Sequence, residues 1–493
     1  MDKLTPAHFD TDLTAEQSSR RIFVKGMGFV SAALLMGSLG GCDKLAEAIR
    51  NRPMRRRLRT GSAAVDADVA TYRAAVAAMK ALPSSDPRSW VAQATIHGTV
   101  ASGFNFCEHG TDHFFDWHRA YLFYFEKICQ KLTGNPKFGL PYWNWNQNQD
   151  IHPAFLDTAS PLFLARTRTS MSGSSAIATA TLDPLFADAN FFTFRQQLEG
   201  TPHNTVHTFI GQTMGSGGSA LDPLFWVHHC MVDYCWYKWN VDLSNNNTND
   251  TSWINHSDTH FVDADGNPAS TNAGLTTIMP LLSYQYESSA IGTHPAAGAL
   301  TTKSAFQRVE KRVREGANVR FEIKQRVHLA DRLATSIAKP VSVETKLSAA
   351  DFSRIIESNA ATERVFATIQ FAQLPATSDF SVRVFVNMPN ADRSTPNTDP
   401  HYAGSFAFFG TSTVAGAPAS DQAQHHHQPQ FLVDLTATIQ RLRQRQDLKA
   451  DAPLSVQLVP TPFADQFERE DTELVINNLE IIVTPVVVSA AQR

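Results

Sequence analysis

The sequence predicts a mainly helical domain followed by a C-terminal domain rich in β-structure. Residues 90–286 alternate helix-compatible segments with loops rich in Gly, Pro, Asn and Ser, such as 170–181 and 245–250. Beyond Val341 the apolar residues instead alternate with a period of two, as in the segment 381–386 (SVRVFV). A period of two is typical of strands, so we expect a β-rich C-terminal unit.

Composition supports this organisation and limits the choice of partner. The chain has 493 residues, of which 43% are hydrophobic and 18% charged, enough for two or three globular cores. Its net charge of -4 argues against a nucleic-acid partner, because binding to phosphates needs clustered Lys and Arg. Five cysteines are too few and too irregularly placed for a disulfide framework, so we expect Cys129, Cys230 and Cys235 to be buried thiols.

The N-terminal segment resembles an export signal, and we assign residues 1–48 to it. The run 19–25 (SRRIFVK), followed by the apolar stretch 26–41, resembles a twin-arginine signal. The stretch is shorter than the ~20 residues that span a bilayer. We therefore expect an exported, periplasmic or secreted protein. Cys42 resembles a lipoprotein processing site and 46–48 (AEA) an ordinary cleavage site, so lipid anchoring and membrane attachment stay open.

The remaining boundaries follow from local composition. A basic linker, 50–59, precedes the Ala-rich stretch 63–81, which predicts a helix. We assign 49–302 to the helical domain, 303–341 to a linker that forms a helix or strand, and 342–493 to the C-terminal domain.

Histidines in the second half of the helical domain have the spacing of metal ligands. His203 and His207 are four residues apart, so on a helix they share one face. His229 supplies a third imidazole from another predicted helix, and Asp233 lies on the same face, where we expect it to support His229. The neighbouring His228 points about 100° away, so we assign it to the cavity wall.

An earlier segment offers a second triad. It contains His97 and His118, and either His109 or His113 completes the set, since spacing does not choose between them. Imidazole suits copper, zinc, nickel and iron, and three such ligands leave positions open for an exogenous molecule. Two triads therefore indicate two metals facing one cavity. The other histidines lack ligand spacing and are expected to be ordinary residues: His152, His256, His260, His294, His401 and the run His425–His427.

The flanking residues resemble the two copper signatures of tyrosinases and polyphenol oxidases, the type-3 dinuclear copper family. The first signature is matched by His109, Phe114, Trp117, His118, Arg119, Leu122 and Glu126, and the second by 222–233 (DPLFWVHHCMVD). The resemblance favours His109 over His113. It implies a catalytic domain built on a four-helix bundle that holds two copper ions, one bound by His97, His109 and His118 and the other by His203, His207 and His229.

Further matches extend the resemblance to the rest of the chain. The segment 284–286 (YQY) resembles the tyrosine motif that closes the catalytic domain, and 382–387 with 403–406 resembles the C-terminal domain of plant-type enzymes. This implies a β-sandwich that can shield the copper pocket. Phe406, Phe408 and Phe409 are candidates for a side chain inserted into that pocket, although for each one we favour a place in the strand core.

The implied activity is copper-dependent oxidation of phenols by O2: ortho-hydroxylation of monophenols and oxidation of o-diphenols to o-quinones. The alternatives are a catechol or o-aminophenol oxidase without hydroxylase activity, and a hemocyanin-like O2 carrier. Glu199 would hold, and Asn204 would orient, a water that deprotonates the monophenol. Cys107, two residues before His109, has the offset at which fungal relatives form a thioether to the imidazole; an ordinary thiol is equally expected. The oligomeric state is not specified by the sequence.

Overall fold

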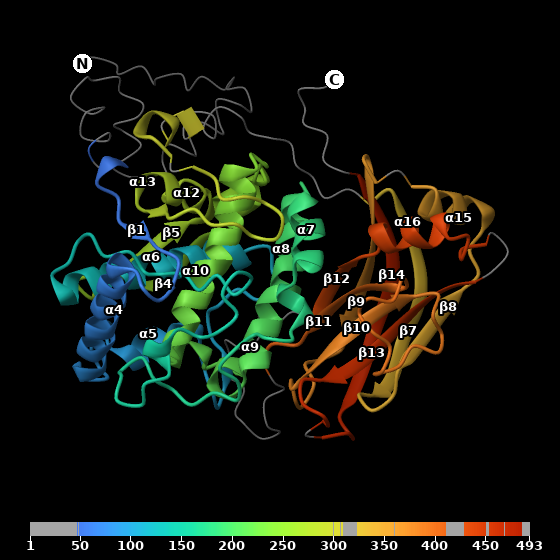
Figure 1. Ribbon diagram of the computed structural model, residues 1–493, viewed down its shortest axis with the longest axis horizontal. Helices are drawn as coiled ribbons and strands as arrows, with labels where there is room; N and C mark the ends of the chain where they lie inside the picture. Colours follow the sequence, from blue (N-terminus) through green and yellow to red (C-terminus); the bar gives the residue numbers. More distant parts are fainter. Residues whose placement is uncertain are drawn as a thin grey trace, which may run out of the picture.

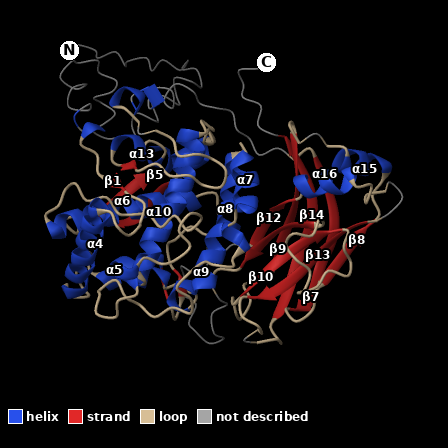
Figure 2. Ribbon diagram, viewed as in Figure 1, coloured by secondary structure: helices blue, strands red, loops and turns tan. Residues whose placement is uncertain are grey.

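The computed structural model describes residues 47–485, apart from 48, 299, 306, 309–322, 359, 411–427, 450–452 and 468. The predicted twin-arginine motif, Cys42 and the run His425–His427 lie outside the described residues. Two units follow one another along the chain, a helical one and a β-rich one, as the ribbon coloured by secondary structure shows (Figure 2).

The helical unit contains ten α-helices between Ala63 and Leu282. They are α4 (Ala63–Ala81), α5 (Trp90–His97), α6 (Phe114–Thr133), α7 (Thr179–Ala187), α8 (Phe191–Leu198), α9 (Asn204–Ile210), α10 (Pro223–Tyr237), α11 (Thr251–Asn255), α12 (Ala273–Thr276) and α13 (Met279–Leu282). Two π-helical turns are η3 (Glu199–His203) and η6 (Lys238–Asp242). Short 3₁₀ turns are η1 (Pro153–Phe155), η2 (Ser175–Ile177), η4 (Gln212–Gly215) and η5 (Ser219–Leu221). The predicted helix over 63–81 is confirmed.

Three short strand pairs connect these helices. They are the parallel pair β1 (Met54–Arg55) and β6 (Gln285–Tyr286), and the antiparallel pairs β2 (Gly98–Thr99) with β3 (Gly103–Phe104) and β4 (Ser257–Val262) with β5 (Pro268–Asn272). Among the described residues, no helix combines the length and the apolar character needed to cross a membrane.

The two central helices, α6 and α10, are fixed at their ends by local chemistry. Asp222 caps α10 by accepting a hydrogen bond from the N–H of Leu224, and Pro223 occupies the first helical position, where no N–H is needed. Arg166 pairs with the buried Asp222 through two nitrogens. Gly134 ends α6 in the left-handed region, at φ 66°.

A buried charged network joins these helices to the tyrosine motif. The carboxylate of Asp233, on α10, accepts hydrogen bonds from Arg119, Arg55, Tyr284 and Tyr286. The guanidinium of Arg119 also lies 3.5 Å from the centre of a Trp ring on α10. Asp233 therefore holds helices and the 284–286 segment together. The expectation that it supports His229 is wrong, because its oxygens face these donors instead.

The β-rich unit consists of two four-stranded antiparallel sheets. One has the order β11 (Tyr402–Ala407), β10 (Phe380–Val386), β13 (Leu454–Pro462), β8 (Val341–Thr345). The other has the order β12 (Gln430–Asp434), β9 (Glu363–Phe371), β14 (Glu473–Pro485), β7 (Gln325–Ser336). Helices α15 (Ala349–Ile356) and α16 (Thr436–Gln444) accompany them. The strands of this unit begin at Gln325, inside the range assigned to the linker, because β7 pairs with β14.

The sheets bury a common apolar core. Val382 and Val384 of β10 belong to the same buried cluster as Ile369 of β9 and Ile481 of β14, so residues two apart on β10 face the other sheet. The side chain of Phe385 lies in a separate cluster. The alternation predicted from the segment 381–386 is thereby confirmed.

The β-rich unit lies against α7, α8 and α9 with the edge formed by β11 and β12 (Figure 1). Its backbone is fixed to the helical unit by hydrogen bonds. The hydroxyl of Thr201 donates to Ser405 O at 2.7 Å, and the amide of Asn204 donates to Ala407 O at 3.0 Å. Asn204 also lines the cavity described next.

Candidate metal centre

The six histidines predicted as ligands converge from six parts of the helical unit. His97 ends α5, His118 lies in α6, His203 ends η3, His207 lies in α9 and His229 in α10. His109 lies on the loop between β3 and α6. Every imidazole except that of His109 belongs to a buried residue, and His109 is intermediate.

The rings form two triads that face each other. In the first, the ring centres of His97, His109 and His118 lie 5.0 to 5.8 Å apart. In the second, the centres of His203, His207 and His229 lie 4.6 to 5.3 Å apart. Across the gap, the rings of His118 and His229 stack at 4.4 Å. The structure places His113 outside this group, stacked on Trp253 and bonded to Asp116.

Backbone carbonyls hold four of the imidazoles through their Nδ1 atoms. The acceptors are Gly217 O for His97 at 2.9 Å, Phe114 O for His118 at 2.8 Å, Met214 O for His207 at 2.8 Å and Glu199 O for His203 at 3.3 Å. Each bond places the proton on Nδ1 and leaves the Nε2 lone pair free, which is the form of imidazole that binds metals.

The Nε2 atoms fit a metal centre. Those of His97, His109, His118 and His203 are buried and have no hydrogen-bond partner among the described residues. Those of His207 and His229 point at each other at 3.2 Å. Because unpaired buried nitrogens are costly and rare, this arrangement indicates ligands for cations rather than a hydrogen-bonded core.

Burial also keeps the rings neutral. Loss of hydration lowers the pKa of His97 to about 4 and that of His203 to about 3, in each case against the opposing effect of the ring's hydrogen bonds. Burial lowers the pKa of His109, His118 and His229 as well, assisted by neighbouring imidazoles. Protons therefore do not compete for these lone pairs near neutral pH.

The Nδ1 atom of His229 has no hydrogen-bond partner among the described residues, and that of His109 has no carbonyl partner. His109 is instead supported by a sulfur atom and an aromatic ring. Its Nδ1 lies 3.2 Å from the Sγ atom of Cys107, a weak partner compared with a carbonyl oxygen. Phe104 stacks on its ring at 4.5 Å. The sequence did not single out Phe104, because an aromatic residue next to a glycine carries no ligand signal. Cys107, Cys129, Cys230 and Cys235 are free thiols, and the last three are buried as predicted.

The cavity-wall residue His228 lies closer to the second triad than its helical angle suggests. One of its ring nitrogens lies within 4.8 Å of those of His203, His207 and His229. Both of its nitrogens lack hydrogen-bond partners among the described residues.

Glycines allow the loop after α9 to approach β3, a role that sequence inspection did not find. A Cβ atom on Gly217 would lie 2.6 Å from Gly103 O, and one on Gly98 would lie 2.6 Å from Gly217 O. Such distances are excluded for real side chains. Glycine at Gly217 therefore brings the carbonyl that holds His97 into place.

The proposed water-holding pair lies at the border between the triads, with Glu199 bonded next to His109 and Asn204 bonded to His203. Glu199 accepts hydrogen bonds from the N–H of Gly110 at 2.5 Å and from Arg195 at 2.8 Å. Burial raises the pKa of Glu199, while Arg195 and Gly110 oppose that shift. The Oδ1 atom of Asn204 accepts from Nδ1 of His203 at 2.9 Å, and its amide nitrogen donates to Ala407 O.

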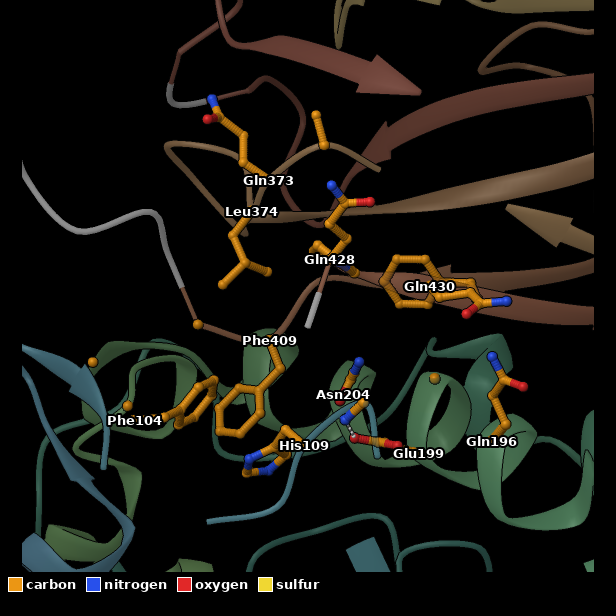
Figure 3. A pocket seen from close by; sticks show the side chains of 18 of the residues that line it. Phe104, His109, Gln196, Glu199, Asn204, Gln373, Leu374, Phe409, Gln428 and Gln430 are labelled. Carbon is orange, nitrogen blue, oxygen red and sulfur yellow. Dashed lines mark hydrogen bonds between the residues drawn. The ribbon is translucent and has the colours of Figure 1, made fainter. Parts of the chain in front are cut away.

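A cavity of about 290 Å³ lies between the two units and opens onto this site (Figure 3). Phe104, His109, Glu199 and Asn204 line its lower wall, and Leu374 with several glutamines lines the side of the C-terminal unit. Phe409 descends from that unit into the space between them.

The ring of Phe409 lies over the histidine cluster, within 6.2 Å of ring centres from both triads. It stacks on His207 with ring centres 3.9 Å apart and an angle of 21°, and it lies 5.2 Å from the ring of His109. Phe406 and Phe408 lie in the core of the β-rich unit, as favoured from the sequence. For Phe409 that expectation is wrong, because its side chain points out of the sandwich and into the metal centre.

The helical unit matches a known domain. Residues 87–160 and 152–242 match the common central domain of tyrosinase, and residues 320–477 match a domain of unknown function, DUF7868. Tyrosinase HcTyr1 of Hahella sp. (strain CCB-MM4) is 28% identical over 84% of this chain and 95% of its own. Polyphenol oxidase A1 of Vicia faba is 24% identical over 88% of this chain and 77% of its own.

Solved structures share the whole arrangement of helical and β-rich units. A recombinant latent aurone synthase (polyphenol oxidase) has a TM-score of 0.63 at 21% identity, covering 89% of this chain and 90% of that one. Latent apple tyrosinase has a TM-score of 0.58 at 19% identity, covering 88% and 97%. Residues 87–242 therefore match a tyrosinase central domain, and the chain is homologous over most of its length to tyrosinases and polyphenol oxidases, enzymes that oxidise phenols with O2 at a dinuclear copper centre.

Proposed function

We propose that this protein is a latent tyrosinase, which hydroxylates monophenols and oxidises o-diphenols once its C-terminal unit is displaced. The single observation that carries the proposal is the ring of Phe409, stacked on His207 at 3.9 Å within the histidine cluster. An aromatic ring already fits between the triads, which supports a phenol as substrate. The same ring blocks the site in the intact chain, which supports latency.

We assign one copper ion to His97, His109 and His118 and the second to His203, His207 and His229, within a bundle formed mainly by α5, α6, α9 and α10. When bound, the copper pair supplies the binding and reduction of O2. The protein supplies neutral ligands, so the metals keep their full positive charge and attract a phenolate. Phe104, stacked on His109, adds an apolar wall for the substrate ring.

Glu199 and Asn204 are proposed to manage the phenolic proton. Glu199 lines the cavity, and its carboxylate is fixed by Gly110 and Arg195, so a water bonded to it would lie at the edge of the site. Hydroxylation requires a deprotonated monophenol, and such a water is the acceptor for that proton. In the intact chain one N–H of the Asn204 amide donates to Ala407 O, so that donor is not available to this water.

The C-terminal unit would therefore inhibit in two ways: Phe409 fills the place of the substrate ring, and Ala407 O occupies the amide of Asn204. Relatives whose names include the word latent, such as the polyphenol oxidase of Prunus armeniaca, support this interpretation. We assign the helical catalytic domain to residues 49–302 and the shielding domain to the strands that follow, with 1–48 as an export segment that directs the protein out of the cytoplasm.

Cys107 is a candidate for a thioether to His109, since its Sγ lies beside that ring. A C–S bond would form with loss of two hydrogens, for which O2 is the oxidant. Intact mass would fall by two hydrogens, and the two positions would appear in one cross-linked peptide. An unmodified peptide containing Cys107 from copper-loaded enzyme would exclude the bond.

The experiment that tests the proposal measures O2 uptake and quinone formation with a monophenol and an o-diphenol. Full-length, copper-quantified protein is compared with the same protein cleaved at a protease site engineered into 309–322. We expect quinone from both substrates after cleavage and little before it. Quinone from the diphenol alone would indicate a catechol or o-aminophenol oxidase, reversible O2 binding without quinone would indicate a carrier, and equal activity before cleavage would refute latency.

A further inference from the structure

A second group of metal-binding side chains lies next to the loop that carries His109. Glu108, His256 and Asp258 each bring one ligand atom within 4.8 Å of the other two. Glu108 comes from the loop before α6, His256 directly follows α11, and Asp258 lies on β4. The group therefore joins two segments that are almost 150 positions apart in the sequence and is separate from the six predicted copper ligands.

Two carboxylate oxygens at this place have no hydrogen-bond partner. Asp258, whose exposed fraction is 6%, directs Oδ1 toward Nε2 of His256 at 3.2 Å and leaves Oδ2 unpartnered. Asp116, which is fully buried, directs Oδ2 toward Nδ1 of His113 at 3.0 Å and leaves Oδ1 unpartnered. Buried carboxylate oxygens without a partner are rare and costly, and a cation between Asp258 and its two neighbours would satisfy the oxygen of Asp258.

The charges of the cluster favour the same conclusion. The rings of His113 and His256 stack with centres 3.7 Å apart, and burial followed by His256 lowers the pKa of His113 to about 4. At most one of the two rings is then positive, against the carboxylates of Glu108 and Asp258, while burial raises the pKa of the Asp116 carboxyl well above its usual range. The pKa of His256 is raised, first by its hydrogen bond with Asp258 and further by all three acidic groups, so this place favours positive charge.

We propose that Glu108, His256 and Asp258 bind one divalent cation of the zinc type. One imidazole nitrogen and two carboxylate oxygens are ligands that Zn²⁺ accepts at about 2.0–2.2 Å, with water completing the tetrahedron. Thr111, whose hydroxyl donates to Glu108 at 2.8 Å, orients one carboxylate, and the stack on His113 fixes the plane of the imidazole.

The ion would restrain the first copper site. It connects β4 to the residue directly before His109, the predicted copper ligand whose Nδ1 has only the Cys107 sulfur as a partner. A cation at Glu108 would thus supply the rigidity that a backbone carbonyl supplies to His97 and His118. This role rests on the proposed binding of copper by His109, whereas binding of the ion itself does not.

The test uses full-length, copper-loaded protein dialysed against excess Zn²⁺ and then freed of unbound metal. Copper outcompetes zinc at imidazole sites, so added zinc reports a separate site. We expect one zinc per chain beside two coppers, and a zinc affinity lowered at least ~10-fold in His256→Asn and in Asp258→Asn. Wild-type protein that retains no zinc would overturn the proposal, as would either variant that retains zinc like the wild type.

Two controls locate the zinc. His260→Asn removes another imidazole from β4, one that stacks on Phe106 at 3.8 Å and lies outside the cluster, and it should retain the zinc. Replacing His425, His426 and His427 together by Ala should also retain it. Loss of zinc in either control would assign the metal elsewhere. A protein that binds the zinc but no copper would refute the proposed function while leaving this inference intact.

The restraining role has its own measurement. Zinc should slow the release of the first copper to a chelator several-fold in the wild type and leave the rate unchanged in Asp258→Asn. Equal release rates of the wild type with and without zinc would overturn the restraining role.

Discussion

The two histidine triads share ligand type but differ in how the protein holds them. In the second triad, all three imidazoles come from α9, α10 and the turn η3 that continues into α9. In the first, His97 and His118 belong to helices and donate to carbonyls, whereas His109 lies on a loop beside a sulfur atom. The second triad is therefore held entirely by helices and helical turns, whereas the first depends on a loop for one of its three ligands.

Removing a ligand tests this contrast with the largest expected effect. His207→Asn and His109→Asn should each lower diphenol oxidation by the cleaved enzyme at least ~100-fold, because both ions are needed and even outer contacts of metal ligands change activity 10–100-fold. Copper content should fall from two ions to one per chain in each variant. The ion that remains should resist chelation better in His109→Asn, where the helix-borne triad is intact. The opposite order would contradict the comparison.

The second prediction concerns Glu199 and Asn204, which lie between the triads and are proposed to position the water that accepts the phenolic proton. Glu199→Gln and Asn204→Ala should lower monophenol hydroxylation by the cleaved enzyme about 100-fold, at the lower end of general-base effects, and diphenol oxidation by less than about threefold. The ratio of the two rates, measured with copper content held equal, reports the effect. An equal loss with both substrates would refute the assignment.

Phe409→Ala removes the ring that covers the second triad. Diphenol oxidation by the intact chain should rise about tenfold, since an aromatic stack contributes about 0.5–1.5 kcal/mol beyond the area it buries. The cleaved enzyme should not respond, because Phe409 has then left the site.

Phe408→Ala is the matched control for that prediction. Phe408 is buried in the sandwich core, so its loss should lower the melting temperature of the β-rich unit through a cavity costing about 3–5 kcal/mol. Activation of the intact chain by Phe408→Ala without unfolding would show that any weakening of the C-terminal unit opens the site.

The smallest effect is expected at the glycine loop. Gly217→Ala places a Cβ atom against Gly103 and displaces the carbonyl that holds His97, so copper affinity at the first triad should fall about 10-fold. Gly215→Ala is the control in the same loop, because its nearest contacts would lie at an ordinary 3.8 Å. Equal copper retention in the two variants, measured by chelator titration, would show that the loop adapts and that His97 is not rigidly held.

Sequence patterns predicted those features that depend on local periodicity or composition. The alternation at 381–386 follows from a two-residue repeat and the helix over 63–81 from its alanine-rich composition, and the structure confirms both. His203 and His207 meet in space as their spacing predicts, although His203 ends a π-helical turn rather than lying within a regular helix. The two rings still lie side by side despite the π-helical turn, because each donates a hydrogen bond to a backbone carbonyl.

Features that depend on contacts between distant segments were beyond sequence inspection. Asp233 has the helical spacing to reach His229, yet its oxygens accept hydrogen bonds from Arg119, Arg55 and two tyrosines. Phe406, Phe408 and Phe409 have similar sequence surroundings, and only the place where β11 ends decides which one enters the helical unit. His256 shows no ligand spacing because its partner Glu108 is far away in the chain.

In the proposed latent state, Phe409 is a tethered inhibitor, because it belongs to the same chain as its target. Intramolecular ligands act at effective concentrations in the millimolar range or above, independent of how dilute the protein is. A dissolved phenol at micromolar concentration therefore competes poorly with Phe409 for the site. Raising the enzyme concentration does not change this competition. After cleavage, the concentration of Phe409 at the site would fall from this effective value to that of the released C-terminal unit in solution. A single proteolytic event would therefore lower the inhibitor concentration by several orders of magnitude.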